Sequence, residues 1–156
     1  MIQVVSHTHN PKLEEMKVVY RRERKEPTQK IRKACDLVTY LRTIWNDETI
    51  DLREELLLVC LSSSHEVKGW VRIAEGGITS ANVDPRLLFG ILLSTASVSF
   101  ILVHNHPSGD TTPSTEDIRV TATLSQGAKL LGLRLLDHIV ISRTEHHSMC
   151  DSGQLP

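Results

Sequence analysis

Two histidines separated by a single residue follow an apolar run in the second half of the chain. His104 and His106 come directly after residues 98–103, a run typical of a buried central strand. Side chains two positions apart in an extended chain point to the same side, so both imidazoles could contact one metal ion. Asp117 comes eleven positions after His106, in the first turn of a predicted helix, and could supply a third ligand.

Two histidines, one carboxylate and a water form a common catalytic zinc site. Zinc lowers the pKa of a bound water toward about 7, which gives hydroxide at neutral pH. Pro107 restricts the backbone of His106 and so lowers the entropic cost of forming the site. Taken alone, His-x-His predicts no more than a turn, and Ser114 with Asp117 is a helix-capping signature. Together these residues favour a metal site, beside which Ser114 could also act as the cap.

The other histidines are interpreted differently. Five of them fall in a polar leader, a predicted hairpin turn or the C-terminal segment, and are expected on the surface: His7, His9, His65, His146 and His147. Asp137 and His138 could orient a metal ligand from behind, but a strand-end pair that satisfies itself is favoured. The adjacent letters His-Asn-His do not make an HNH nuclease, and a nucleobase deaminase would need a Pro-Cys-x-x-Cys segment that the chain lacks.

The elements that must position these residues follow from hydrophobic periodicity and from turn residues. We expect a loose leader over 1–14, with a short strand at 16–20 and a helix over 28–45. A hairpin should follow, with strands at 55–61 and 67–74 and with Trp70 and Arg72 on its outer face. Further along we expect a helix at 85–95, a strand at 98–103, a helix at 114–131 and a final strand at 133–141. This order predicts a mixed α/β domain, a sheet flanked by helices.

Composition narrows the class of protein. The chain has 156 residues, which fits one compact domain, and aromatic residues make up only 4%, so the core must consist of Leu, Ile and Val. The net charge of -1 does not suggest a polyanion binder. Between Lys12 and Lys33, however, nine basic side chains stand beside four acidic ones. A solvated helix face is the favoured interpretation of this segment, and a patch for nucleic acid or an acidic partner is the alternative.

Cysteine usage and hydropathy predict the cellular setting. Cys35, Cys60 and Cys150 are an odd number without a framework spacing, which indicates reduced thiols. We find neither a signal peptide nor an apolar stretch approaching the roughly 18 residues of a membrane span. We therefore expect a cytoplasmic protein without membrane contact.

The spacing of the candidate ligands resembles a known family. His104-x-His106, seven residues, Ser114, two residues and Asp117 match the JAMM motif of the JAB/MPN metalloprotease superfamily. The segments 104–109 and 113–117 are similar to the RadC branch, as are 83–86 and 135–141. The resemblance spans about residues 50–148 and implies a cytidine-deaminase-like JAB/MPN fold. We expect a leader with the basic segment at 1–27, the RadC-like domain at 28–150 and a tail at 151–156.

The resemblance also implies a mechanism. A family glutamate stands just before the leading apolar strand, where Glu54 lies, and Glu55 is the close alternative. Strand alternation would send these two carboxylates to opposite faces, so they should not be interchangeable. The implied activity is hydrolysis of a peptide or isopeptide bond in a peptide or protein substrate. It uses one zinc per chain with His104, His106 and Asp117 as ligands, Glu54 as general base and Ser114 as oxyanion donor.

Two other functions stay open. One is a binding module associated with DNA repair or a mobile element, with weak nucleic-acid contact through the basic segment. Longer RadC proteins carry a helix-hairpin-helix region, and the absence of a Gly-x-Gly hairpin from residues 1–50 weakens this alternative. The other is a metal-dependent nuclease, which the low number of nearby carboxylates disfavours. Neither the physiological substrate nor the oligomeric state follows from the sequence.

Overall fold

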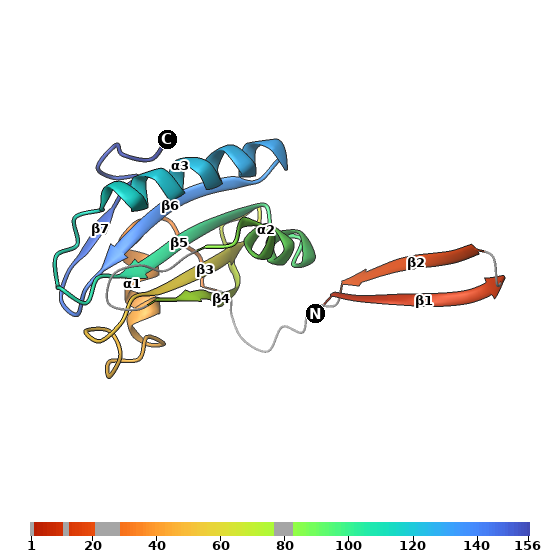
Figure 1. Ribbon diagram of the computed structural model, residues 1–156, viewed down its shortest axis with the longest axis horizontal. Helices are drawn as coiled ribbons and strands as arrows, with labels where there is room; N and C mark the ends of the chain where they lie inside the picture. Colours follow the sequence, from red (N-terminus) through yellow and green to blue (C-terminus); the bar gives the residue numbers. More distant parts are fainter. Residues whose placement is uncertain (1, 11–12, 21–28, 77–82) are drawn as a thin grey trace.

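A five-stranded mixed sheet forms the centre of the domain (Figure 1). The computed structural model describes residues 2–10, 13–20, 29–76 and 83–156, with the backbone alone over 2–20. The sheet order is β4-β3-β5-β6-β7, and within it only β5 and β6 pair in parallel. The strands are β3 (Glu55–Leu61), β4 (Val67–Glu75), β5 (Ser99–Asn105), β6 (Arg134–Ile141) and β7 (His146–Ser148).

Helices cover both faces of this sheet (Figure 1). Helix α1 (Ala34–Arg42) packs on one face, while α2 (Pro85–Ser94) and α3 (Thr115–Leu130) pack on the other. Each residue of β3 and β5 is buried, because alternate side chains enter the two separate cores. This arrangement confirms the predicted mixed α/β sheet flanked by helices. None of the described helices is both long and apolar enough to cross a membrane.

The N-terminal residues differ from the prediction. Strands β1 (Ile2–Asn10) and β2 (Leu13–Tyr20) pair antiparallel as a separate two-stranded sheet. The loose leader expected over 1–14 was therefore wrong for 2–10 and 13–14, while the short strand expected at 16–20 is part of β2. Polar composition misled the prediction, because the β-branched residues Ile2, Val4, Val5 and Thr8 favour extended backbone whatever lies between them.

The first helix begins later than its periodicity predicts. Residues 29–31 run extended beside the start of β4, with a bridge between Lys30 and Glu66. The amide of Ile31 donates to the His65 carbonyl at 3.0 Å, and that of Val67 donates to the Gln29 carbonyl at 2.8 Å. These strand-like bonds hold residues 29–31 out of the helix, which starts only at Ala34.

Most other boundaries were predicted to within a residue or two. Helix α2 begins at Pro85 behind the cap Asp84, and α3 begins behind the cap Ser114 and stops before Gly132, whose φ is 67°. Two expectations were wrong. Trp70 is partly buried against the core on the α1 side and does not lie on an outer face. The strand expected to be final is followed by β7, whose three polar residues carry no apolar signal.

Candidate metal centre

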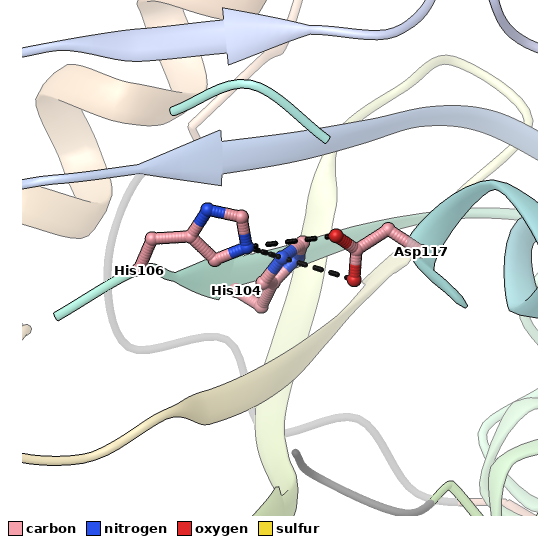
Figure 2. A group of neighbouring side chains, drawn as sticks. All are labelled: His104, His106 and Asp117. Atoms are coloured by element: carbon pink, nitrogen blue, oxygen red, sulfur yellow. Dashed lines mark hydrogen bonds and ion pairs between the residues drawn. The ribbon is translucent and has the colours of Figure 1, made fainter. Parts of the chain in front are cut away.

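Three of the predicted ligands meet at one point. The Nε2 atoms of His104 and His106 lie 2.9 Å apart. One carboxylate oxygen of Asp117 is 3.3 Å from the first, and the other oxygen is 3.5 Å from the second. Figure 2 shows both imidazoles, carried by β5 and the residue after it, turned toward the Asp117 side chain on α3. Their ligand atoms all lie within 4.8 Å of one another, so the cluster could hold a metal ion.

The strand carries the histidines further than predicted. We expected the strand to end at Val103, but β5 continues to Asn105 because His104 and Asn105 pair with Val140 and Ile141 of β6. His104 therefore projects from a strand onto the face covered by α3, which fixes its direction more firmly than a loop would. His106 follows directly, and its amide donates to the Ile141 carbonyl at 3.0 Å.

Helix α3 places the Asp117 carboxylate on the same face of the sheet as the His104 ring. Ser114 caps the helix, and the Asp117 amide donates to its hydroxyl at 3.1 Å. In return, the Asp117 carboxylate accepts from the Ser114 amide at 2.7 Å and from its hydroxyl at 2.6 Å. This reciprocal capping box orients the Asp117 side chain before any ligand arrives. Ser114 and Asp117 therefore form the helix cap and also lie at the candidate metal site.

The lone pairs and the negative charge at this point favour a cation. His106 donates through Nδ1 to the Asp110 carbonyl at 2.7 Å, because a carbonyl can only accept. In neutral His106 the other ring nitrogen, Nε2, therefore presents a lone pair toward Nε2 of His104. A nearby carboxylate adds negative charge to this pair of nitrogens. A metal ion or a proton between these groups relieves the repulsion, so the donor set fits a divalent cation that takes imidazole and carboxylate ligands.

The pKa shifts follow the same electrostatics. Burial alone would raise the pKa of Asp117, but its contacts with the imidazoles of His104 and His106 outweigh burial and hold that pKa well below its usual range. The contact with Asp117 is the main reason that the pKa of His106 is raised, and the charge of Glu54 acts in the same direction. Without a metal ion, His106 therefore holds a proton more tightly than a free imidazole does.

Glu54 and Glu55 occupy different environments. Glu55 is 1% exposed, and its two carboxylate oxygens are ion-paired with Arg53 at 3.0 Å and with Arg72 at 2.9 Å. Glu54 is partly buried, and its carboxylate is close enough to His106 to raise the pKa of that imidazole. Of the two carboxylates, Glu55 is thus occupied by arginines, whereas the charge of Glu54 reaches His106 of the candidate metal cluster.

Asn105, which lies between the two histidines, points the other way. Its side chain is fully buried and binds the segment that carries Glu54. The amide oxygen accepts from the Glu55 backbone at 2.7 Å, and Nδ2 donates to the carbonyls of Ile50 and Arg53 at 2.6 and 2.8 Å. Sequence reasoning missed this role, because it placed the residue in a loop.

Asp137 and His138 are not a self-satisfied pair. Asp137 binds the C-terminal segment, accepting from the Ser148 hydroxyl at 2.6 Å and from the Cys150 amide at 2.9 Å. The His138 ring lies on the other side of β6, where its Nε2 is 2.8 Å from Nδ1 of the ligand candidate His104. The favoured interpretation was therefore wrong for the His138 ring, which lies behind the candidate ligand His104. Asp137 does accept from the His138 amide, at 2.8 Å.

The remaining predicted residues lie outside this centre or outside the described parts of the chain. His146 is exposed, and His147 bonds to Ser152 and Gln154 near the C-terminus. His65 is half-buried in the turn between β3 and β4. The side chains of His7, His9 and most of the basic segment fall in residues whose side chains are not described. The alternative of a nucleic-acid patch there stays a prediction.

A mixed sheet whose central strand presents His-x-His to the first turn of a covering helix defines a JAB-type domain. The match to a family model then gives the branch. Residues 22–154 match the model described as RadC-like JAB domain, and the chain belongs to this family. The resemblance drawn from the motif spacing is thus confirmed.

Similar proteins occur in archaea and bacteria. A UPF0758 protein of Methanosarcina barkeri is 34% identical over 128 residues, which are 82% of this chain and 55% of the relative. A UPF0758 protein of Desulfitobacterium hafniense is 43% identical over 103 residues, 66% of this chain and 45% of the relative. The chain therefore spans about half the length of the curated relatives it matches, and their name states no activity or substrate.

Proposed function

We propose that this RadC-like JAB domain is a zinc-dependent hydrolase of the JAMM type that cleaves an amide bond as a peptidase or isopeptidase. The observation that carries the proposal is the convergence of two imidazole nitrogens and a carboxylate on one point. Glu54 beside them supports hydrolysis over mere metal storage, because amide cleavage needs a general base next to the activated water.

In this proposal, different residues of the chain bind the metal and transfer the proton. His104, His106 and Asp117 would hold the ion, and zinc in such a site polarises a carbonyl and lowers the pKa of a water. Glu54 accepts a proton from the attacking water and returns it to the leaving amine. Glu55 takes no part, because its carboxylate is buried between Arg53 and Arg72.

Ser114 is the proposed donor to the developing oxyanion. In the ligand-free arrangement its hydroxyl donates to Asp117 at 2.6 Å. Rotation about a single side-chain bond redirects this proton without disturbing the helix, because the cap also rests on the Asp117 amide and the Ser114 backbone. Replacement by alanine therefore costs both a cap and a donor, whereas threonine keeps both.

The metal requirement is tested by elemental analysis of the purified protein. Wild type should contain about one zinc per chain. His104→Ala and Asp117→Ala should lose it. Folded wild-type protein that takes up no zinc would overturn the proposal, whatever its other activities.

The hydrolytic step is tested with a library of peptides and isopeptide-linked peptides. Glu54→Gln should keep its zinc and lose about 10²–10⁴-fold in cleavage rate, the usual contribution of a general base. Glu48→Gln is the matched control, since Glu48 is an exposed glutamate from the turn that precedes β3. Equal cleavage by Glu54→Gln and wild type would rule out the assigned base.

A further inference from the structure

A buried chain of hydrogen bonds connects two of the candidate ligands from behind. It starts at Nδ1 of His104, which lies 2.8 Å from Nε2 of His138. Nδ1 of His138 lies 2.6 Å from the hydroxyl of Thr121, and that hydroxyl bonds to the backbone carbonyl of Asp117. His138 is 2% exposed and Thr121 is fully buried, so water does not compete with these bonds.

The direction of every bond in this chain follows from its far end. The Asp117 carbonyl has no proton, so the Thr121 hydroxyl must donate to it, as helical threonines often do to the carbonyl four residues back. The same hydroxyl also lies 3.7 Å from the sulfur of Met149, a much weaker acceptor. Its single proton is thereby used, and toward His138 the hydroxyl oxygen can only accept.

The proton positions on both imidazoles are then fixed. His138 donates from Nδ1 to Thr121. Its ring is buried and its two nitrogens bond to a hydroxyl and to another imidazole, so it carries one proton, and its Nε2 accepts. His104 must therefore donate from Nδ1, which leaves the lone pair of its Nε2 directed at His106 and Asp117.

We propose that His138 and Thr121 are positioning residues that hold His104 in the Nδ1-protonated tautomer, the one in which Nε2 is able to bind a metal ion. The metal part of this inference rests on the proposed function, whereas the tautomer is a property of the protein alone. Because the chain ends on the backbone of Asp117, it also ties the helix that supplies one ligand to the strand that supplies another. Hydrogen-bond partners behind a ligand histidine typically change metal affinity by about 10–100-fold.

The test compares Thr121→Val with Thr121→Ser. Valine has the same shape and lacks the hydroxyl, and serine keeps it. The first readout is nitrogen-15 NMR of histidine-labelled, metal-free protein, in which wild type and Thr121→Ser should show His104 protonated at Nδ1 and not at Nε2. In Thr121→Val, His138 loses its acceptor, so a measurable share of His104 should move to the Nε2-protonated form.

The second readout is zinc affinity, measured by competition with a chelating dye. Thr121→Val should bind zinc about 10–100-fold more weakly than wild type. Thr121→Ser should stay within a few-fold. Thermal unfolding of the metal-free variants checks that both are folded. His138→Gln, whose amide can both accept and donate, should lie between the two threonine variants.

The outcomes separate this inference from the proposed function. Nε2-protonated His104 in metal-free wild type overturns the inference, as does a folded Thr121→Val that binds zinc as tightly as Thr121→Ser. If the tautomer and the affinity loss are both found but no peptide is cleaved, the positioning role stands and the hydrolase proposal fails. If wild type shows the tautomer but takes up no zinc, the ligand role assigned to His104 is overturned together with the proposed function.

Discussion

Replacement of Asn105 tests whether Glu54, the proposed general base, is held in place by the strand that carries the histidines. Its side chain makes three hydrogen bonds, to the Glu55 amide and to the carbonyls of Ile50 and Arg53. Asn105→Ala removes all three and leaves the partners buried. At about 1 kcal/mol for each bond, the expected loss of unfolding free energy is about 3 kcal/mol. For a chain of this size, that corresponds to a fall in Tm of roughly 6–12 °C.

Two further variants make this prediction specific. Asn46→Ala is the matched control, because the Oδ1 of the exposed Asn46 accepts one local bond, from the Glu48 amide, and its loss should cost about 0.5–1 kcal/mol. Asn105→Asp keeps the size of the side chain and the acceptor for Glu55, but turns an anionic oxygen toward two carbonyls. It should destabilise at least as much as alanine does.

The same variants distinguish an effect on stability from an effect on zinc binding and cleavage. The Asn105 side chain lies on the opposite face of β5 from the ring of His104, so Asn105→Ala should retain its zinc. Cleavage should fall, because the segment that carries Glu54 is no longer held. The assays are denaturant unfolding, zinc content and peptide cleavage on the same preparations. A loss of stability below about 1 kcal/mol, or an Asn105→Asp variant as stable as wild type, would refute the reasoning.

Three other predictions concern stability and reactivity. Asp137→Ala should lower the free energy of unfolding by about 3 kcal/mol, because the bonds that the carboxylate accepts are lost. Asp137→Asn keeps one acceptor oxygen and should cost clearly less in chemical unfolding. Equal losses for the two variants would contradict this. A thiol reagent should modify the exposed Cys35 and Cys150 in native protein and reach Cys60 only on unfolding, because the Cys60 side chain is buried. Rapid modification of a third thiol in native protein would be inconsistent with this. In metal-free protein the raised pKa of His106 means that its stabilising contribution is complete below about 6.5 and is lost as pH rises through the folded pKa. Unfolding measured across this range should show a slope that Asp117→Asn abolishes, and an unchanged slope would argue against the pair.

The convergence of His104, His106 and Asp117 could be predicted because its information is local. The side chains of His104 and His106 are two positions apart in extended chain and so point the same way, and the capping signature at Ser114 predicts the helix start that carries Asp117. Short-range rules are therefore enough. The boundaries of α2 and α3 were found for the same reason, since Pro85 and Ser114 are start signals in themselves.

The supporting residues could not be predicted, because their partners are distant in sequence. His138 contacts a ring 34 positions away, and the contact depends on the register of β6 against β5. The apolar run of β5 does not reveal which strand it pairs with. Without that pairing, Asp137 and His138 were interpreted as satisfying each other. The helix expected from residue 28 failed similarly, because the bridge between Lys30 and Glu66 overrides a helical periodicity.

Once the register of β3 against β5 is known, the alternation of side chains along the strand distinguishes Glu54 from Glu55. In the pairing of β3 with β5, Leu56 stands opposite His104. Continuing that antiparallel register two residues outward brings Glu54 opposite His106, on the face covered by α3. Glu55, one position away, must turn to the opposite face, which is where Arg53 and Arg72 neutralise it. Moving the proposed general base to Glu55 would therefore require more than a carboxylate in the neighbouring position. It would require a shift of β3 by one residue, which would exchange the side chains that β3 contributes to the two cores.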